Sequence, residues 1–217
     1  MPYGYLGQNT PNQTVSNSGV FSISDVASLE KQGKFGGSLE LIEEQTISSS
    51  TSAVDFTSIQ ENKYDVHFIQ TKNTLLSASG TSHLVLYFSN NGGSSFITSG
   101  NQYAYQTCSP NGTFGEGKST SLGFASYLSG NYHSSSNKSS HNAYTYIYNA
   151  GNSSKYTFST TQMVGFDSTN IAGFNWFGGN VYATAETINA FRIGTNDSST
   201  IERLEVKLYG VKQLWVL

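Results

Sequence analysis

The sequence predicts an all-β protein, an antiparallel sandwich of two sheets that we expect to be a jelly roll. Aromatic residues are plentiful among the 217 residues, with 14 Tyr and 13 Phe, and aromatic side chains suit pleated sheets. Charged residues make up 12% of the chain, against about 25% in typical soluble domains. Short segments of alternating apolar and polar residues recur between loops rich in Ser, Asn and Gly, and no helices alternate with them.

Eight to ten segments between residues 38 and 217 have the pattern of short strands. In the first, Leu39 and Leu41 alternate with Glu40. Ile42 then breaks the alternation, which predicts a β-bulge or a sheet edge at this point. The other segments are 63–71, 83–90, 101–108, 142–151, 155–164, 173–179, 190–195 and 201–217.

Side-chain alternation assigns faces within several of these strands. In the segment 63–71, one face carries Tyr64, Val66 and Phe68, and the other carries Asp65, His67 and Ile69. In the last segment, one face carries Leu204, Val206 and Leu208, and the other carries Glu205, Lys207 and Tyr209. The segment 83–90 is apolar on both faces and runs into Asn90–Gly93, whose sequence NNGG is a strong turn signal.

The N-terminal segment differs from the rest of the chain. Residues 1–20 are polar and aperiodic and include two of the three prolines, so we expect an extended arm. Ser24 is a good N-cap for a short helix that Gly33 would close. We therefore divide the chain into an arm and short helix over 1–37, which serve attachment and assembly, and a β-sandwich over 38–217. The candidate assembly contacts of the arm are Tyr3, Tyr5, Leu6, Val15 and Val20.

Composition and charge exclude several kinds of partner. The net charge is −3, the 11 basic residues are scattered, and Arg192 and Arg203 are the only two arginines, so nucleic acid is not expected to bind. No apolar stretch approaches the length of a membrane span, and the N-terminus does not have the pattern of a signal peptide. Cys108, the single cysteine, allows no intramolecular disulfide and is expected to be a buried, inert thiol. No cofactor is expected.

The segment 112–120, GTFGEGKST, matches the phosphate-binding pattern G-x-x-x-x-G-K-[ST] over its first eight residues. That loop works only between a buried strand and the helix that it opens, where backbone N–H groups surround the phosphates. Here an alternating segment precedes it and a Ser- and Gly-rich segment follows it. We therefore expect a surface loop with Lys118 in solvent. We predict that the protein is not an enzyme. The alternative is a nucleotide hydrolase that uses Lys118.

Histidines offer little for catalysis or metal binding. His67 and His83 lie within strand patterns, where a structural or surface role is expected. His133 and His141 lie in a predicted loop without a nearby carboxylate, and zinc would need further ligands that this loop does not supply. No G-x-S-x-G nucleophile motif is present either.

Two pairs of carboxylates are spaced too unfavourably for glycoside hydrolysis. Glu43 and Glu44 are adjacent on a strand and therefore face opposite sides. Glu202 and Glu205 also have opposite parity, and basic residues lie beside them. A solvated strand face is the simpler interpretation of both pairs.

Tyr144, Tyr146 and Tyr148 are the best binding feature, because residues two apart on a strand form a flat amphipathic platform. Such a platform can stack on sugar rings, with Asn142 and Asn149 nearby, or on another protein surface. The alternative is that these tyrosines cover one face of the sandwich or pack against the opposing sheet.

Two ends of the chain resemble structural proteins of tailed phages that infect marine bacteria, including cyanophages. The resemblance lies in the segment 4–47, with its NSGVFS and following Asp25, and in 204–212, with its LYGVK strand. It implies a virion component on a jelly-roll-like sandwich, assembled in the host cytoplasm with other virion proteins, and it brings no catalytic residues. Family analogy implies a homo-oligomer, and a trimer is expected.

The function expected from these observations is that of a non-enzymatic virion structural protein, a fibre, knob or head-decoration subunit anchored by its arm. The alternative is a virion adhesin that binds a host surface glycan or receptor, on the tail or elsewhere. The sequence leaves the head, neck or tail location open.

Overall fold

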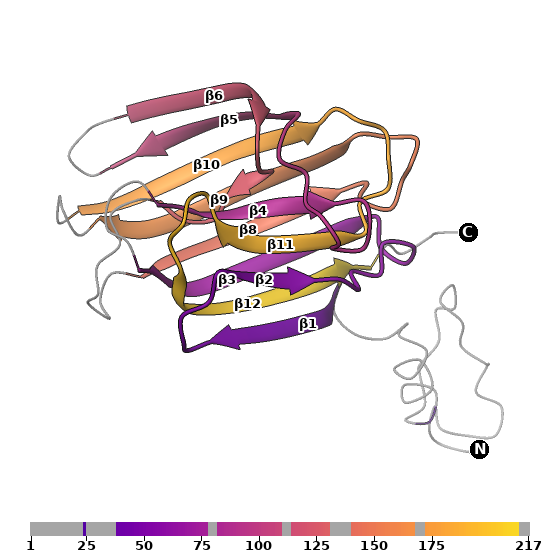
Figure 1. Ribbon diagram of the computed structural model, residues 1–217, viewed down its shortest axis with the longest axis horizontal. Helices are drawn as coiled ribbons and strands as arrows, with labels where there is room; N and C mark the ends of the chain where they lie inside the picture. Colours follow the sequence, from indigo (N-terminus) through magenta and orange to yellow (C-terminus); the bar gives the residue numbers. More distant parts are fainter. Residues whose placement is uncertain are drawn as a thin grey trace, which may run out of the picture. The chain divides into compact units, whose positions relative to one another are not determined.

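The computed structural model describes Ser24 and the residues 38–77, 82–109, 114–130, 140–167 and 172–212. The arm at 1–20, with Tyr3, Tyr5, Leu6, Val15 and Val20, and the predicted helix apart from Ser24, lie outside the described residues. Within the described ranges the chain is nearly all β and forms two antiparallel sheets (Figure 1). This confirms the predicted all-β sandwich.

Twelve strands are present in the described residues. They are β1 (Leu39–Ile47), β2 (Ala53–Phe56), β3 (Val66–Leu76), β4 (Leu84–Ser89), β5 (Asn101–Cys108), β6 (Phe114–Leu122), β7 (Ser126–Tyr127), β8 (His141–Tyr148), β9 (Thr157–Asp167), β10 (Ala172–Tyr182), β11 (Ala190–Thr195) and β12 (Ile201–Val211). The sequence pattern predicts all of them except β2, β6 and β7.

The two sheets are unequal in size. The large sheet has eight strands in the order β1-β12-β3-β8-β9-β10-β5-β6, and the small sheet has four in the order β2-β11-β4-β7. The chain passes repeatedly from one sheet to the other, so most neighbours within a sheet are distant in sequence. The jelly-roll connectivity stays a prediction.

The core lies between the small sheet and the inner face of the large sheet. The fully buried side chains of the large sheet include Ile69, Ile147, Met163, Leu204, Val206 and Leu208, and those of the small sheet include Phe56, Phe88, Phe191 and Ile193. Period-2 alternation directs these side chains inward and their neighbours outward. The predicted faces of β12 and of the residues from Val66 onward in β3 are therefore confirmed.

Tyr64 is an exception to the predicted faces. It precedes β3 and is buried, with its ring directly over Gly210 of β12. A Cβ on Gly210 would overlap with this ring. Its predicted place on the face of Phe68 is therefore wrong, because the strand that would direct it there begins only at Val66.

Two local predictions are confirmed. The register of β1 against β12 shifts between Leu41 and Glu43, so Ile42 marks a bulge, and β1 is also an edge strand. The NNGG segment after β4 is a turn in which Gly92 and Gly93 have φ angles of 70° and 86°, a region that glycine adopts without steric cost. It leads the chain out of the small sheet toward β5 of the large sheet.

Aromatic rings extend the core beneath β10 and β5. The ring of Trp176 lies 4.5 Å from that of Tyr105 and 4.9 Å from that of Tyr127, which is stacked on it. Burial raises the pKa of the Tyr103 hydroxyl in the same cluster. These rings therefore connect β7 of the small sheet with β5 and β10 of the large sheet.

Histidine side chains are part of this interior. His67 of β3 is fully buried, its Nε2 donates to the carbonyl oxygen of Ile59 at 2.9 Å, and its ring lies 5.6 Å from that of Phe191. His83, just before β4, is half-buried, and its Nδ1 lies 3.1 Å from the carbonyl oxygen of Ser129. Burial lowers the pKa of both imidazoles below the ordinary value of 6.5, against the opposing effect of these hydrogen bonds.

We predict that the protein loses stability as the pH falls below about 6.5. The unfolded chain binds protons on these histidines near that pH, whereas the folded chain binds them only at lower pH, so acidification favours unfolding. The urea midpoint should fall between about pH 7.5 and about pH 5. In His67→Gln, which retains a donor for Ile59, the midpoint should depend less on pH. An equally steep dependence in wild type and variant would contradict the assignment.

Candidate interaction face on the eight-stranded sheet

His141, which the sequence places in a loop, is part of the protein interior. His141 begins β8 and is fully buried, and its Nδ1 accepts a hydrogen bond from the N–H of Gly130 at 3.1 Å. Its predicted place in a loop is therefore wrong, because the strand starts one residue earlier than the alternation of the tyrosines suggests. His133 lies outside the described residues. Within the described ranges no three His, Cys, Asp or Glu side chains gather as metal ligands would.

Carboxylates are used in surface contacts. Glu44 forms an ion pair with Lys207 at 3.1 Å, whereas Glu43 accepts a hydrogen bond from Gln45 at 2.6 Å. Glu205 forms an ion pair with Lys72 at 3.3 Å. Glu43 and Glu44 point to opposite sides as predicted, because Glu43 lies opposite the buried Leu208 and Glu44 lies opposite the outward Lys207. Glu44 and Glu205 lie on the outer face as predicted, whereas Glu43 is half-buried on the core-facing side of the edge strand.

Most of the segment 112–120, which matches the phosphate-binding pattern, forms a strand. The prediction of a surface loop is therefore wrong for the residues from Phe114 onward. Residues from Phe114 onward form the edge strand β6, paired with β5. Gly117 faces inward under Tyr105, and a Cβ there would overlap with the tyrosine ring. The glycine therefore makes room for an aromatic side chain of the next strand. Lys118 points outward and is exposed, as predicted.

Cys108 ends β5 on the outward parity and is half-buried. The prediction of a buried thiol is therefore too strong, because the residue lies near the end of a strand whose outer neighbours are exposed. No helix among the described residues has the length and apolar character needed to cross a membrane.

The predicted tyrosine platform lies on the outer face of the large sheet, so packing against the opposing sheet is excluded. Tyr144, Tyr146 and Tyr148 point outward from β8, whereas the alternating residues between them are buried. Phe68 of β3 lies 4.8 Å from the Tyr146 ring and 5.9 Å from that of Tyr209 on β12. We call these five residues the aromatic ridge.

The apolar surface extends far beyond the ridge. Nine large apolar side chains in the described chain are strongly exposed, and eight of them have outward parity in the large sheet: Leu39, Leu41, Phe114, Tyr144, Phe158, Val164, Phe166 and Phe177. The ninth, Tyr156, lies in the turn before β9. Large exposed apolar patches on soluble proteins mark interaction sites. The face is therefore the candidate functional surface.

The two predicted asparagines have different places. Asn142 lies on the outer face next to the ridge, and its Oδ1 accepts a hydrogen bond from the N–H of Asn73 at 3.2 Å. Asn149 lies in the turn after β8, with a φ of 64°, and its Nδ2 donates to the carbonyl oxygen of Tyr156 at 3.2 Å. Asn149 therefore stabilises the turn and is not part of the platform.

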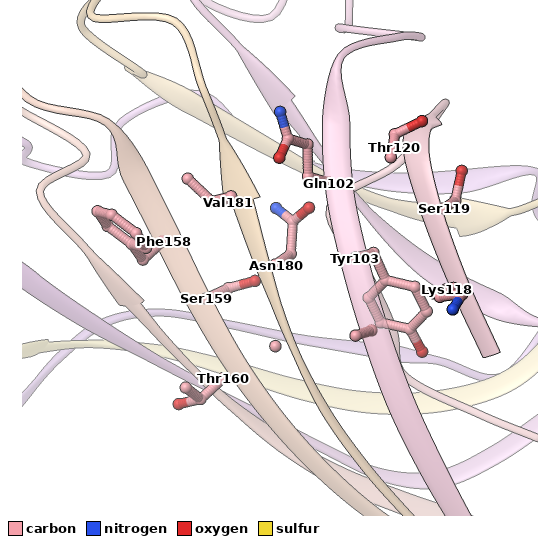
Figure 2. Close-up of a pocket in the computed structure, with 12 residues that line it drawn as sticks. Gln102, Tyr103, Lys118, Ser119, Thr120, Phe158, Ser159, Thr160, Asn180 and Val181 are labelled. Carbon is pink, nitrogen blue, oxygen red and sulfur yellow. The ribbon is translucent and has the colours of Figure 1, made fainter. Parts of the chain in front are cut away.

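A shallow groove of about 830 Å³ crosses β9, β10, β5 and β6 at the other end of this face (Figure 2). Its floor is made of small residues that lie side by side on adjacent strands, Thr160, Gly179 and Ala104. Lys118 closes the row on β6, opposite Ala104. Phe158, Val181 and Gln102 bound the groove on one side of this row. On its other side the same row borders a second hollow of about 530 Å³, which Phe177, Gln106 and Glu116 bound, so the two hollows share one floor. Alternation within single strands could not reveal the groove, because it depends on which strands are neighbours.

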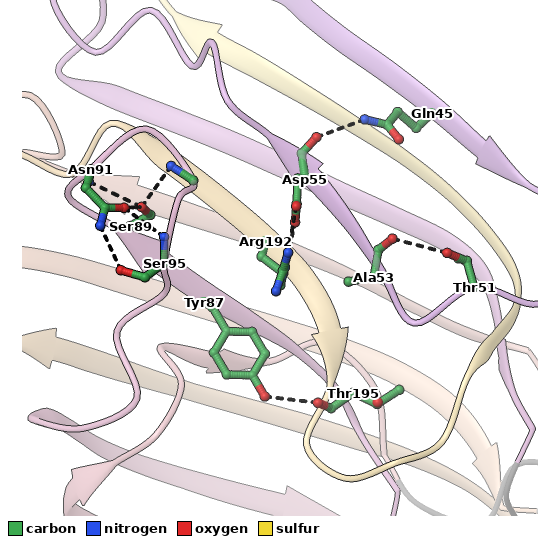
Figure 3. A network of polar contacts seen from close by, with 11 residues as sticks. Gln45, Thr51, Ala53, Asp55, Tyr87, Ser89, Asn91, Ser95, Arg192 and Thr195 are labelled. Atoms are coloured by element: carbon green, nitrogen blue, oxygen red, sulfur yellow. Dashed lines mark hydrogen bonds and ion pairs between the residues drawn. The ribbon is translucent and has the colours of Figure 1, made fainter.

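The outer face of the small sheet is chemically different (Figure 3). Arg192 of β11 forms a bidentate ion pair with Asp55 of β2, at 2.6 and 2.7 Å, and its guanidinium also lies 4.0 Å from the ring centre of Phe96. Tyr87 of β4 donates its hydroxyl to the carbonyl oxygen of Thr195 at 2.9 Å. Polar side chains here satisfy one another, which leaves the large sheet as the apolar face.

We predict that Gly117→Ala lowers the melting temperature while Lys118→Ala does not. Overlap with the Tyr105 ring costs about 1–3 kcal/mol as in other overpacked sites, or roughly 2–10 °C in a domain of this size. The side chain of Lys118 is exposed and stabilises little. Calorimetry with and without Mg-ATP checks the enzyme alternative as well. If Mg-ATP raised the melting temperature of the wild type and not that of Lys118→Ala, the result would support nucleotide binding through Lys118.

Comparisons of the chain with protein-family models, with curated proteins and with solved structures found no match.

Proposed function

We propose that the protein is a non-enzymatic structural subunit of a phage particle, a fibre, knob or head-decoration subunit, and that it assembles with copies of itself through the aromatic ridge. The proposal of self-assembly is supported by the aromatic and apolar side chains exposed on the outer face of the large sheet. The virion role rests on the resemblance of the two chain ends, and other virion proteins are the further partners.

The ridge half of the face has the size of a specific interface. It covers β1, β12, β3 and β8, which are adjacent in the sheet. Four strands about 4.8 Å apart and about nine residues long give a surface of roughly 600 Å². Specific interfaces bury about 600–1,000 Å² on each partner. Tyrosine and phenylalanine are also the side chains that such interfaces favour.

Charge on this half is balanced within each copy. Lys72 pairs with Glu205 and Lys207 pairs with Glu44, in each case across adjacent strands. The hydrogen bond from Asn73 and the ion pair with Lys72 lower the pKa of Glu205, so it stays ionised and paired. A second copy of the same surface therefore meets apolar rings and compensated charges, without a field of like charge to oppose it.

We predict that Leu41→Glu and Tyr146→Glu dissociate the assembly. Leu41 is 50% exposed and lies opposite Tyr209 across the β1–β12 ladder, so a carboxylate there enters the proposed interface without disturbing the core. Central interface residues contribute about 2–4 kcal/mol, so the dissociation constant should rise by roughly 30-fold or more. Sedimentation velocity and native mass spectrometry measure it, and three copies is the expected number.

Phe177→Glu is the matched control. Phe177 is 51% exposed and points outward from β10, away from the ridge strands, so this variant should assemble like the wild type. A monomeric wild-type protein at micromolar concentration, or equal dissociation by Phe177→Glu, would refute assembly through the ridge.

We also predict that a chain without residues 2–20 folds but no longer joins the phage particle. The arm is polar and has no periodic row of apolar residues that could pack into the core. The β-sandwich should therefore keep its melting temperature without it. Immunoblotting of purified particles measures incorporation. Normal incorporation of the shortened chain would rule out anchoring by the arm.

A further inference from the structure

The groove on β9, β10, β5 and β6 has a floor that the fold does not require. Gly179 lies in the middle of β10, has no positive φ angle, and a Cβ there would lie 3.4 Å from its nearest neighbour, the carbonyl oxygen of Ser159. Alanine would therefore fit. By contrast, Cβ atoms at Gly178 and Gly117 would overlap with Ala104 or Tyr105. Glycine inside a strand is destabilising, and it often marks a bulge, a bend, or the close approach of a ligand or another backbone. The register of β10 against β9 and β5 is regular at Gly179, so no bulge accounts for this glycine.

The walls of the groove combine apolar and amide side chains. Phe158 bounds the first hollow and Phe177 bounds the second, on opposite sides of the shared floor row, and both are strongly exposed. Gln102 and Gln106 stand on opposite sides of Ala104 on β5. Within the described chain the side-chain amides of these two glutamines make no hydrogen bond, so they are available as donors and acceptors.

We propose that this groove binds an unbranched, neutral glycan chain, which lies across the strands. A sugar ring has an apolar face that packs on phenylalanine and hydroxyl groups at its rim that bond to amides. The walls are four residues apart along β10, about 13 Å between Cα atoms, which leaves room for one chain between the side chains. This inference goes beyond the proposed function and does not depend on it, because the ridge lies on other strands.

The charge and the backbone of the groove favour a glycan over other polymers. Lys118 and Glu116 on β6 have opposite charges, so the groove offers no basic track for a nucleic acid or polyanion. The N–H and C=O groups of β10 are paired with β9 and β5. A peptide that crossed the strands would find no ladder to join and would leave its own backbone groups without partners.

An array of linear neutral oligosaccharides of two to eight sugars, probed with the full chain, tests the proposal. We expect binding to a subset of the longer chains. Gly179→Val should weaken it at least tenfold, because the added methyl groups fill the floor. Gly173→Val is the matched control: it lies outward on the same strand but outside the groove, and its Cβ has space, 3.9 Å from the nearest atom. Both variants should keep the wild-type melting temperature and oligomeric state.

Three outcomes would overturn the proposal: no oligosaccharide binds, binding survives Gly179→Val, or both valine variants lose binding equally. Loss of binding in Tyr146→Glu with retention in Gly179→Val would also overturn it, and would move glycan recognition to the ridge. Because sedimentation of the same samples reports assembly separately, failure of glycan binding is distinguishable from failure of self-association.

Discussion

The packing of a four-stranded sheet against one face of an eight-stranded sheet is the constraint on which the rest of the molecule depends. Phe56, Phe88 and Phe191 of the small sheet are buried against the inner side chains of the large sheet and close the core. A sandwich has no third layer, so the outer face of the large sheet has no partner within the described chain. Because strands alternate, every buried Ile or Leu there requires an outward neighbour, and many of these neighbours are aromatic.

Much of this arrangement could be predicted from the residues themselves. The alternation at Leu204, Val206 and Leu208 and at the three tyrosines of β8 assigns faces correctly, because period-2 alternation is a local property. The bulge at Ile42 was also visible as a break in that period. The strand β6 was not, because its inward positions are Gly115 and Gly117, which lack the apolar side chains that mark a core-facing row.

What the sequence could not predict is the neighbourhood of each strand. Phe68 and Tyr209 join Tyr146 only because β3 lies beside both β12 and β8, although the three are far apart in sequence. The groove has the same origin, since Thr160, Gly179 and Ala104 come from three strands. The aromatic ridge and the groove thus occupy different halves of one face. A subunit could therefore contact other copies through the ridge and bind a glycan in the groove at the same time.

The bulge in β1 has a further consequence for the geometry of any assembly. A regular, flat edge strand invites strand-by-strand addition of further copies, which has no natural end and produces fibrils. The register shift between Leu41 and Glu43 interrupts the row of backbone groups at one edge of the large sheet. Contact through a face, in contrast, fixes a rotation between copies, and a rotation that closes on itself gives a particle of finite size. A single residue out of register in β1 thereby works against strand-by-strand addition at this edge of the large sheet.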